Sequence, residues 1–340
     1  MKKKHCYPSI KRDSIKKNLF KCGVVVILMV FVATSGCVTQ SDTTIKISGA
    51  FALYPMMSIW AQEYQLLHPE IKFDLSAGGA GKGVSDALNG MVDIGMVSRD
   101  IHDEEIEQNL FWVSVAKDAV VATMHADNPV IEDILSKGIT KQQFEKIFIT
   151  RTITTWGQLF NDSDNTDIIR VYTRSDSCGA ASTWANYLGD YEQDDLTNHA
   201  DSAVDGDPNL AATVQGDVLG IGYNNINYIY DATTDEPFEN LQPVPIDLNE
   251  NGILDDEEDF YDTQTTMIQA IADTIYPSPP ARALHLVTKQ NFTGIVKEFV
   301  YWILTDGQTY VPDNGYICLS EQSIEQQLDY LDVGTRPEMP

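Results

Sequence analysis

The sequence predicts an α/β fold divided into two lobes. The chain of 340 residues is long for one hydrophobic core and is of ordinary size for two lobes. Short apolar runs typical of strands alternate with stretches in which apolar residues recur at helical spacing, a pattern that favours an α/β fold. The long apolar run Val113–Met124 is expected to cross between the lobes, and the later run Ala283–Thr288 is expected to cross back.

The amino-terminal part, residues 1–36, is expected to be a signal peptide. Its apolar run Val24–Ala33 follows a basic stretch and is too short to span a membrane comfortably. The small residues Thr34–Gly36 before Cys37 resemble the lipobox of exported lipoproteins, which implies that the Cys37 sulfur is lipidated and that residues 37–44 form a tether. A plain signal peptide and a transmembrane anchor are the alternatives. In each case the remainder of the chain would lie outside the cytoplasm.

In the first part of the chain, each expected element is a short apolar run or a helical stripe bounded by turn residues. Pro55 suits the first turn of a helix. In order, the expected elements are a strand at Ile45–Ile47, a helix from about Pro55 with Met57, Trp60, Ala61, Tyr64 and Leu67 in the core, a strand at Ile71–Leu75, a helix with Val84, Ala87, Leu88 and Met91 on one face, and a strand at Val92–Val97.

The second part follows the same alternation up to the return crossing. The expected elements are a strand at Ile168–Thr173, a helix with Trp184, Ala185 and Leu188 that ends at Gly189, a strand at Val218–Tyr223, a break at Pro277–Pro280, and a core helix at Gly294–Leu304. After Cys37 only Cys178 and Cys318 remain, so the sequence is not a disulfide framework. A single pair between these two cysteines is the alternative, which the place of Cys178 in a glycine loop disfavours.

The charge balance excludes one broad class of partner. The chain has 23 Lys and Arg against 50 Asp and Glu, a formal net charge of −27. A general nucleic-acid binder needs a basic face against the phosphate backbone, so nucleic acid is not an expected partner. An acidic surface also repels small anions at long range, and any anion site must therefore be built locally.

Three strand–loop–helix units provide such a local site. Their loops are Ser48–Leu53, Gly78–Gly83 and Arg174–Ala180. A helix start offers unpaired N–H groups and a partial positive charge, and small residues let an anion approach the backbone. Tight strand-to-helix turns also use glycine for structural reasons alone. Three such loops in one chain, with Arg99 after a strand and Arg174 opening a loop, favour an anion site.

Other ligand classes lack their sequence patterns. A P-loop would need glycine at Ser76 and Ser or Thr at Gly83, and the dinucleotide-binding glycine spacing is absent from the same loop. No G-x-S-x-G nucleophile motif occurs, and the six histidines form no zinc-binding pattern. The sequence therefore gives no indication of an enzyme.

Several blocks of the sequence resemble the phosphate-binding proteins of ABC transporters, over roughly residues 45–330. Arg174–Ala180 is similar to the R-x-D-x-S-G-T loop of that family. The other matching blocks are Ser48–Pro55, Ala77–Gly83, Val92–Arg99, the lobe crossing Val115–Val121, and Gly220–Tyr223.

The resemblance implies a two-lobed periplasmic-binding-protein fold of type II with the ligand cleft between the lobes. Lobe 1 would hold residues 45–118 and 284–340, and lobe 2 residues 119–283. The protein would be a monomer that captures phosphate and delivers it to an ABC permease. The phosphate-binding residues carried over from the family are Ala50, Phe51, Ala80, Gly81, Ser98, Arg99, Arg174, Cys178, Gly179 and Ala180.

The chain departs from the family at three of these positions. Ala80, Cys178 and Ala180 replace residues whose hydroxyls donate to the oxyanion in family members. Phosphate and related tetrahedral oxyanions therefore both stay open as ligands. Arg99 and Arg174 are expected to supply charge and forked hydrogen bonds.

A second motif lies in lobe 2. Residues 247–258 fit the calcium-loop pattern D-x-[DN]-x-[DN]-G-x5-E, with Gly252 at the turn. Pro243 and Pro245 oppose a leading helix, so we expect an isolated loop holding one structural Ca²⁺. An acidic, solvated loop is the alternative. The expected ligands are Asp247, Asn249, Asn251, the Ile253 carbonyl, Asp255 and Glu258.

Two other functions stay open on the sequence. A surface sensor or adhesion protein could use the same fold, and an exported phosphatase would need a nucleophile and a metal cluster that the sequence does not display. Asn161 and Asn291 begin N-x-S/T sequons, whose use as glycosylation sites the sequence does not decide.

Overall fold

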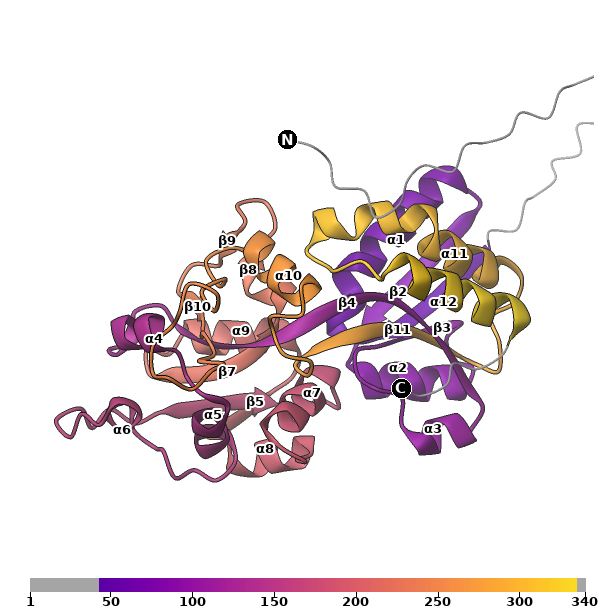
Figure 1. Ribbon diagram of the computed structural model, residues 1–340. Helices are drawn as coiled ribbons and strands as arrows, with labels where there is room; N and C mark the ends of the chain where they lie inside the picture. Colours follow the sequence, from indigo (N-terminus) through magenta and orange to yellow (C-terminus); the bar gives the residue numbers. More distant parts are fainter. Residues whose placement is uncertain (1–42, 335–340) are drawn as a thin grey trace, which may run out of the picture.

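The structure is a computed structural model that describes residues 43–334. The expected signal peptide and Cys37 lie outside the described residues. Two lobes are joined by two long antiparallel strands, β4 (Leu110–His125) and β11 (Ala281–Lys289), which pass from one lobe to the other (Figure 1). In the part of the chain that is described, no helix is long and apolar enough to cross a membrane.

Lobe 1 is formed by the segments before and after the two crossings. In Figure 1, α1, α11 and α12 lie on one side of its strands, and α2 and α3 lie on the other. Its elements are β1 (Thr43–Gly49), the 3-10 helix η1 (Phe51–Leu53), α1 (Tyr54–Leu67), β2 (Ile71–Ala77), α2 (Ala80–Leu88), β3 (Ile94–Val97), α3 (Asp103–Glu107), α11 (Gly294–Leu304), η3 (Asp306–Tyr310), η4 (Pro312–Asn314) and α12 (Glu321–Val333).

Lobe 2 is the segment between the crossings. Its helices are α4 (Ile131–Lys137), α5 (Lys141–Phe148), α6 (Trp156–Phe160), α7 (Gly179–Leu188), α8 (Gln193–His199), α9 (Asp207–Gln215), η2 (Ile226–Tyr228) and α10 (Gln264–Ala272). Its strands are β5 (Arg170–Arg174), β6 (Ser202–Val204), β7 (Gly220–Asn225), β8 (Tyr230–Asp231), β9 (Glu236–Pro237) and β10 (Leu241–Pro243).

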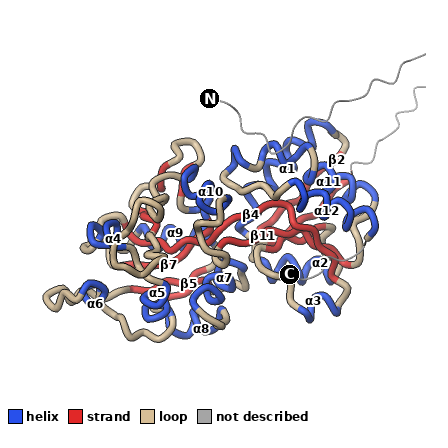
Figure 2. The backbone as a smooth tube through the Cα atoms, viewed as in Figure 1, coloured by secondary structure: helices blue, strands red, loops and turns tan. Residues whose placement is uncertain are grey.

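Strands run through both lobes along the crossing strands β4 and β11 (Figure 2). They form one sheet in the order β2-β1-β3-β11-β4-β7-β5-β6, with β10 also paired to β4. Strands β1, β2 and β3 are parallel to one another in lobe 1, and β5, β6 and β7 are parallel in lobe 2. The crossing strands β4 and β11 are antiparallel to their neighbours. The mixed sheet confirms the predicted α/β class and places strand-to-helix loops of both lobes beside the crossing.

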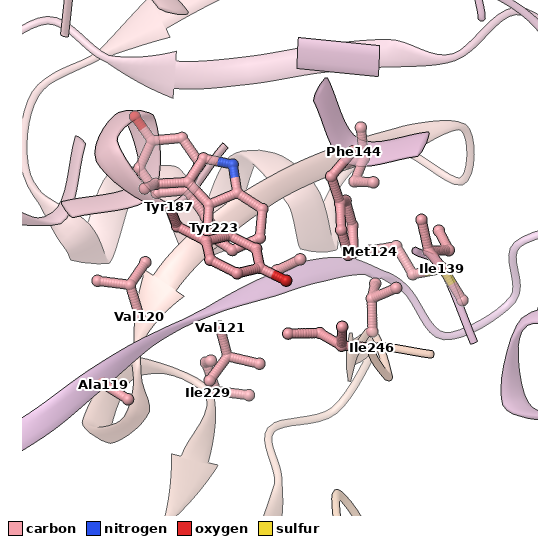
Figure 3. Close-up of a cluster of buried hydrophobic side chains, with 14 of the residues drawn as sticks. Ala119, Val120, Val121, Met124, Ile139, Phe144, Tyr187, Tyr223, Ile229 and Ile246 are labelled. Atoms are coloured by element: carbon pink, nitrogen blue, oxygen red, sulfur yellow. The ribbon is translucent and has the colours of Figure 1, made fainter. Parts of the chain in front are cut away.

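Each lobe has its own hydrophobic core. Figure 3 shows part of the lobe 2 core, in which Val120 and Val121 of β4 lie in one cluster with Phe144 of α5 and Tyr223 of β7. Along β4 the core membership changes from lobe 1 to lobe 2 after Ala116, and along β11 it changes back before Leu284. The two cores therefore meet at the crossing strands.

Two expectations for the helices of lobe 1 were wrong. Leu67, expected in a helix core, is 63% exposed, and Met91, expected on a helix face with Leu88, is 64% exposed. Leu67 is the last residue of α1, and α2 ends at Leu88, before Met91 is reached. A helical stripe stops predicting burial where the helix itself ends. The pattern also missed the short elements of lobe 2, because five to nine residues carry little periodic signal.

Candidate functional site

Three helices begin at the three loops that the sequence singled out. The first residues are Phe51 in η1, Ala80 in α2 and Gly179 in α7. The N–H groups in the first turn of a helix have no acceptor within that helix and carry partial positive charge. Two of these starts belong to lobe 1 and one to lobe 2, so an anion between them would be held by both lobes.

The α2 and α7 loops touch across the lobe boundary. The Gly81 N–H donates to the Ser177 carbonyl at 3.1 Å. A Cβ atom at Gly79, whose φ is +87°, would lie 2.9 Å from the Asp176 Oδ2 atom, and one at Gly179 would lie 2.1 Å from the Ser98 carbonyl oxygen. Only glycine permits these approaches, which bring the ends of β2, β3 and β5 together.

Phe51 of lobe 1 also contacts lobe 2. The Arg174 guanidinium carbon lies 5.3 Å from the centre of the Phe51 ring, within the range of a cation–π interaction. The Tyr228 hydroxyl donates to the Phe51 carbonyl at 3.0 Å. The start of η1 is therefore fixed against lobe 2, beside the guanidinium of Arg174.

Arg174 is completely buried at the end of β5. Its Nε and Nη2 atoms donate to the two oxygens of Asp176 at 2.8 and 2.6 Å, and its Nη1 atom donates to Asp207 at 2.5 Å. Burial opposes the charge of Arg174, but Asp207 and its other neighbours outweigh this effect and raise the pKa of the guanidinium. Arg174 is therefore a permanent cation whose single charge is more than offset by two carboxylates.

Arg99 follows β3 and is paired within lobe 1. Its Nη2 and Nη1 atoms donate to the two Glu105 oxygens at 2.6 and 3.0 Å, and Nη1 also donates to the Asp100 carbonyl at 2.8 Å. Burial raises the pKa of Glu105, but the hydrogen bonds and charge of Arg99 have the larger, opposite effect, so the pKa is lowered overall. The terminal nitrogens of Arg99 are thus engaged by its own lobe, and its expected contact with a ligand stays a prediction.

Cys178 caps α7 with its side chain. The Ala181 N–H donates to the Cys178 sulfur at 3.4 Å, and the Cys178 N–H donates to Gln193 Oε1 at 3.2 Å. Burial raises the pKa of this free thiol to about 12, so the sulfur is a neutral group at physiological pH.

The backbone donors predicted for the ligand differ in whether the protein already uses them. The Ala50 N–H donates to the Met96 carbonyl at 2.9 Å. Among the predicted donors, the first-turn N–H groups of Phe51, Ala80, Gly179 and Ala180 have no acceptor inside their own helices.

Four buried residues near this boundary were missed by the sequence analysis. Asp207 is the first residue of α9, after Gly206 and before a proline, which is an ordinary helix start with no functional signal. The others lie far apart in the chain, and nothing in their local sequence indicates that they meet. The four residues are Asp118, Asp207, Asn225 and Arg282.

The predicted calcium loop lies in lobe 2, next to the connection between α4 and α5. Asp247 and Glu258 are buried, at 2% and 5% exposed. The Asp247 carboxylate accepts from the Asn251 and Gly252 N–H groups at 3.2 and 2.9 Å, and Glu258 Oε1 accepts from the Leu248 and Asn249 N–H groups at 3.0 Å each. Gly252 has the positive φ of +81° that the turn was expected to need.

Asp255 accepts from the side-chain amides of Asn249 and Asn251, each at 2.8 Å. Within residues 43–334, no three His, Cys, Asp or Glu side chains form a group that could hold a metal ion. Besides its carboxylates, the loop is expected to offer a metal ion the side-chain amide oxygens of Asn249 and Asn251 and the backbone carbonyl of Ile253. A cavity of about 390 Å³ adjoins the loop, between Lys141, Tyr187 and Pro279, and is distinct from the site between the lobes.

Comparison with known proteins agrees with this arrangement. Residues 37–307 match the family model of the PBP superfamily domain. The chain is 26% identical over 289 residues to the phosphate-binding protein PstS of Bacillus subtilis, covering 84% of each chain. It is 23% identical over 385 residues to the protein of the same name from Methanocaldococcus jannaschii, covering 92% of this chain and 94% of that one.

Among solved structures, one similar protein is described as a phosphate ABC transporter substrate-binding protein from Clostridium perfringens with bound phosphate. It has a TM-score of 0.66 and 26% identity, and the match covers 82% of this chain and 100% of that chain. An ABC-type phosphate transport receptor from Vibrio cholerae shares the fold, with a TM-score of 0.58 and 20% identity over 81% of this chain and 100% of that chain. Together with the two lobes and the crossing strands, the family match shows that this chain belongs to the PBP superfamily.

Proposed function

We propose that this protein binds phosphate between its lobes and delivers it to an ABC permease in the membrane. The observation that carries the proposal is the meeting of the α2 and α7 helix starts beside the buried guanidinium of Arg174. The names of the relatives from Bacillus subtilis and Methanocaldococcus jannaschii, and the phosphate bound in the similar Clostridium perfringens structure, support the same ligand.

The site would bind an anion through local dipoles and not through net positive charge. Asp176 and Asp207 together more than offset the single positive charge of Arg174. The N–H groups of Phe51, Ala80, Gly179 and Ala180 would then supply the hydrogen bonds, each strengthened because the closed lobes exclude water. Opening about β4 and β11 would separate the lobe 1 donors from the lobe 2 donors and release the ligand.

The replaced hydroxyls leave more of the binding to the backbone. Ala80 and Ala180 have no side-chain donor, and the Cys178 thiol is a weak one. A net hydrogen bond contributes roughly 0.5–1.5 kcal/mol, and more to a charged partner, so three lost hydroxyls could shift both affinity and selectivity. The ligand is therefore proposed as phosphate or a related tetrahedral oxyanion.

Titration calorimetry of the purified protein with phosphate, arsenate and sulfate tests this function. We expect heat of binding with phosphate, and the ranking of the three anions would define the selectivity. Absence of heat with all three anions would overturn the proposal. A bound oxyanion that copurifies with the protein would be detected by phosphorus analysis or by native mass spectrometry.

We also propose that the protein binds its ligand without transforming it, is exported as a monomer, and is anchored to the outer face of the cell membrane through a lipid on Cys37. The basic stretch, the short apolar core and the small residues before Cys37 support export and anchoring.

For residues 247–258 we propose one structural Ca²⁺. The match at every position of the calcium-loop pattern supports it. The turn at Gly252 has the conformation that the pattern requires. Because the loop packs on α4 and lines a cavity away from the cleft, the ion would stabilise lobe 2 and leave the oxyanion site unchanged.

A further inference from the structure

A buried ion pair lies where the two crossing strands pass between the lobes. Arg282 of β11 is opposite Asp118 of β4 in the strand register. The Arg282 Nε and Nη2 atoms donate to the two Asp118 oxygens at 2.9 and 3.3 Å. Asp118 is 1% exposed and Arg282 is 8% exposed. Charges so deeply buried persist only when they are paired and hydrogen-bonded, so this pair is a rigid point between the lobes.

The rest of the Arg282 guanidinium reaches into lobe 2. Its Nη1 atom donates to the Thr183 hydroxyl of α7 at 3.0 Å, and its Nη2 atom also donates to the Asn225 side chain at the end of β7. Thr183 lies about one helical turn beyond Gly179, where α7 begins. Arg282 therefore holds the helix whose first turn offers N–H groups to the proposed ligand.

The same guanidinium is linked to Arg174 through two side chains. The Asn225 Nδ2 atom donates to Asp207 Oδ1 at 2.8 Å, and Asp207 Oδ2 accepts from Arg174 Nη1 at 2.5 Å. Asn225 and Asp207 are 2% and 1% exposed. A continuous buried chain of hydrogen bonds thus runs from the crossing strands to the cation of the oxyanion site.

We propose that Arg282 is a positioning residue of the oxyanion site, which it serves from the crossing strands by fixing α7 directly and Arg174 through Asn225 and Asp207. This inference rests on the proposed function. Arg282 touches no ligand in this role. It keeps the donors in the binding geometry before the ligand arrives, so that less ordering is needed on binding and the affinity is higher.

Substitutions at Thr183 separate positioning from packing. Thr183→Val keeps the branched shape but removes the acceptor of Arg282, whereas Thr183→Ser keeps the hydroxyl and removes a methyl group. We expect Thr183→Val to raise the dissociation constant for phosphate by about tenfold, as for a lost hydrogen bond to a charged group. Thr183→Ser should stay within about threefold of the wild type, since the bond to Arg282 is retained. Thr213→Val on α9, where the hydroxyl bonds only its own helix, is the matched control.

Arg282→Lys keeps the positive charge but removes the planar guanidinium group, which donates to several partners in fixed directions. It should weaken phosphate binding by at least as much as Thr183→Val. The double variant Thr183→Val with Arg282→Lys should be no weaker than Arg282→Lys alone, because the bond is already lost. Amide hydrogen exchange in the first turn of α7, without ligand, should quicken in Thr183→Val and stay unchanged in Thr183→Ser.

The outcomes distinguish this inference from the proposed function. If the wild type binds no oxyanion, the proposed function fails, and the hydrogen-exchange comparison still decides whether Arg282 positions α7. If the wild type binds phosphate, equal affinities for Thr183→Val and the wild type would overturn the inference. Weaker phosphate binding in Thr183→Ser with unchanged binding in Thr183→Val would also overturn it, and would show that Thr183 acts through the packing of its methyl group. If the losses of phosphate affinity from the two substitutions add in the double variant, the two residues act separately and the inference is overturned.

Discussion

The Nη1 atom of Arg174 lies 2.5 Å from the Oδ2 atom of Asp207, and both side chains are shielded from water. Asp176 binds the other side of the same guanidinium. An anion that enters beside Arg174 therefore meets a cation whose charge two carboxylates already more than offset. In a chain of formal net charge −27, this means that neither the whole surface nor the central arginine attracts the ligand by net charge. The helix starts must supply the attraction.

Arg174→Ala should weaken phosphate binding by more than about tenfold, because it removes charge-assisted donors and leaves two carboxylates beside the site. Arg170→Ala is the matched control, since Arg170 lies on the same strand but is exposed and pairs with Asp217. Calorimetry of both variants measures the effect, and a thermal melt establishes that each is folded. Unchanged affinity in a folded Arg174→Ala variant would remove Arg174 from the site.

Because His285 is buried, we expect the folded protein to lose stability in mild acid. Burial, with smaller contributions from Arg99 and Arg282, lowers the pKa of His285 to about 4, and the Ser114 hydroxyl contacts its Nδ1 atom at 3.0 Å. Because the folded protein resists protonation of His285 and the unfolded chain does not, this contribution is fully present above pH 6.5 and falls as the pH drops toward 4. The expected loss between pH 7 and pH 5 is about 2 kcal/mol.

Urea unfolding at pH 7 and at pH 5 measures this loss for the wild type and for His285→Gln. The variant should lose less stability than the wild type between the two pH values, since Gln does not titrate. His199→Gln, at an exposed position on α8, should behave like the wild type. An identical pH dependence in His285→Gln and the wild type would contradict the assignment.

Cys37→Ser should release the protein from membranes, because lipidation requires the sulfur. Fractionation of cells followed by a carbonate wash measures the bound share. Cys178→Ser is the control, since that thiol is buried in lobe 2 and should have no effect on membrane attachment. Retention of Cys37→Ser in the washed membranes would favour an uncleaved transmembrane anchor.

Removal of calcium should lower the melting temperature, since an ion that binds only the folded state stabilises it by mass action. Glu258→Gln should abolish most of the difference between calcium and chelator, because this position is expected to supply two oxygens. Glu257→Gln, the same substitution at the exposed neighbouring residue, should preserve it. Equal melting temperatures in calcium and in chelator would refute the site. A large change in phosphate affinity on chelation would show that the loop is coupled to the cleft.

Local pattern was sufficient for the main elements that frame the site. Apolar runs marked β1, β2, β3, β5 and β7 to within about three residues at each end, and the run Val113–Met124 marked the crossing strand β4. The glycine loops predicted that a helix follows each of them, because a helix start after a tight turn is decided by neighbouring residues. The short helix η1 inside the first loop was not predicted. Short elements such as α6 and β8 were missed, since five residues or fewer hold too little periodic signal.

The sequence by itself determined the α/β class, the places of the three strand–loop–helix units and the resemblance that names a family, because each depends on residues close together in the chain. Only the tertiary structure decided which charges are paired. Arg174 and Asp207 are 33 residues apart, and Arg282 and Asp118 are 164 apart. Arg99, which looked available to a ligand, is held by Glu105. A buried charge needs an oppositely charged partner, but the tertiary structure determines which residue lies beside it. The local sequence therefore does not identify that partner.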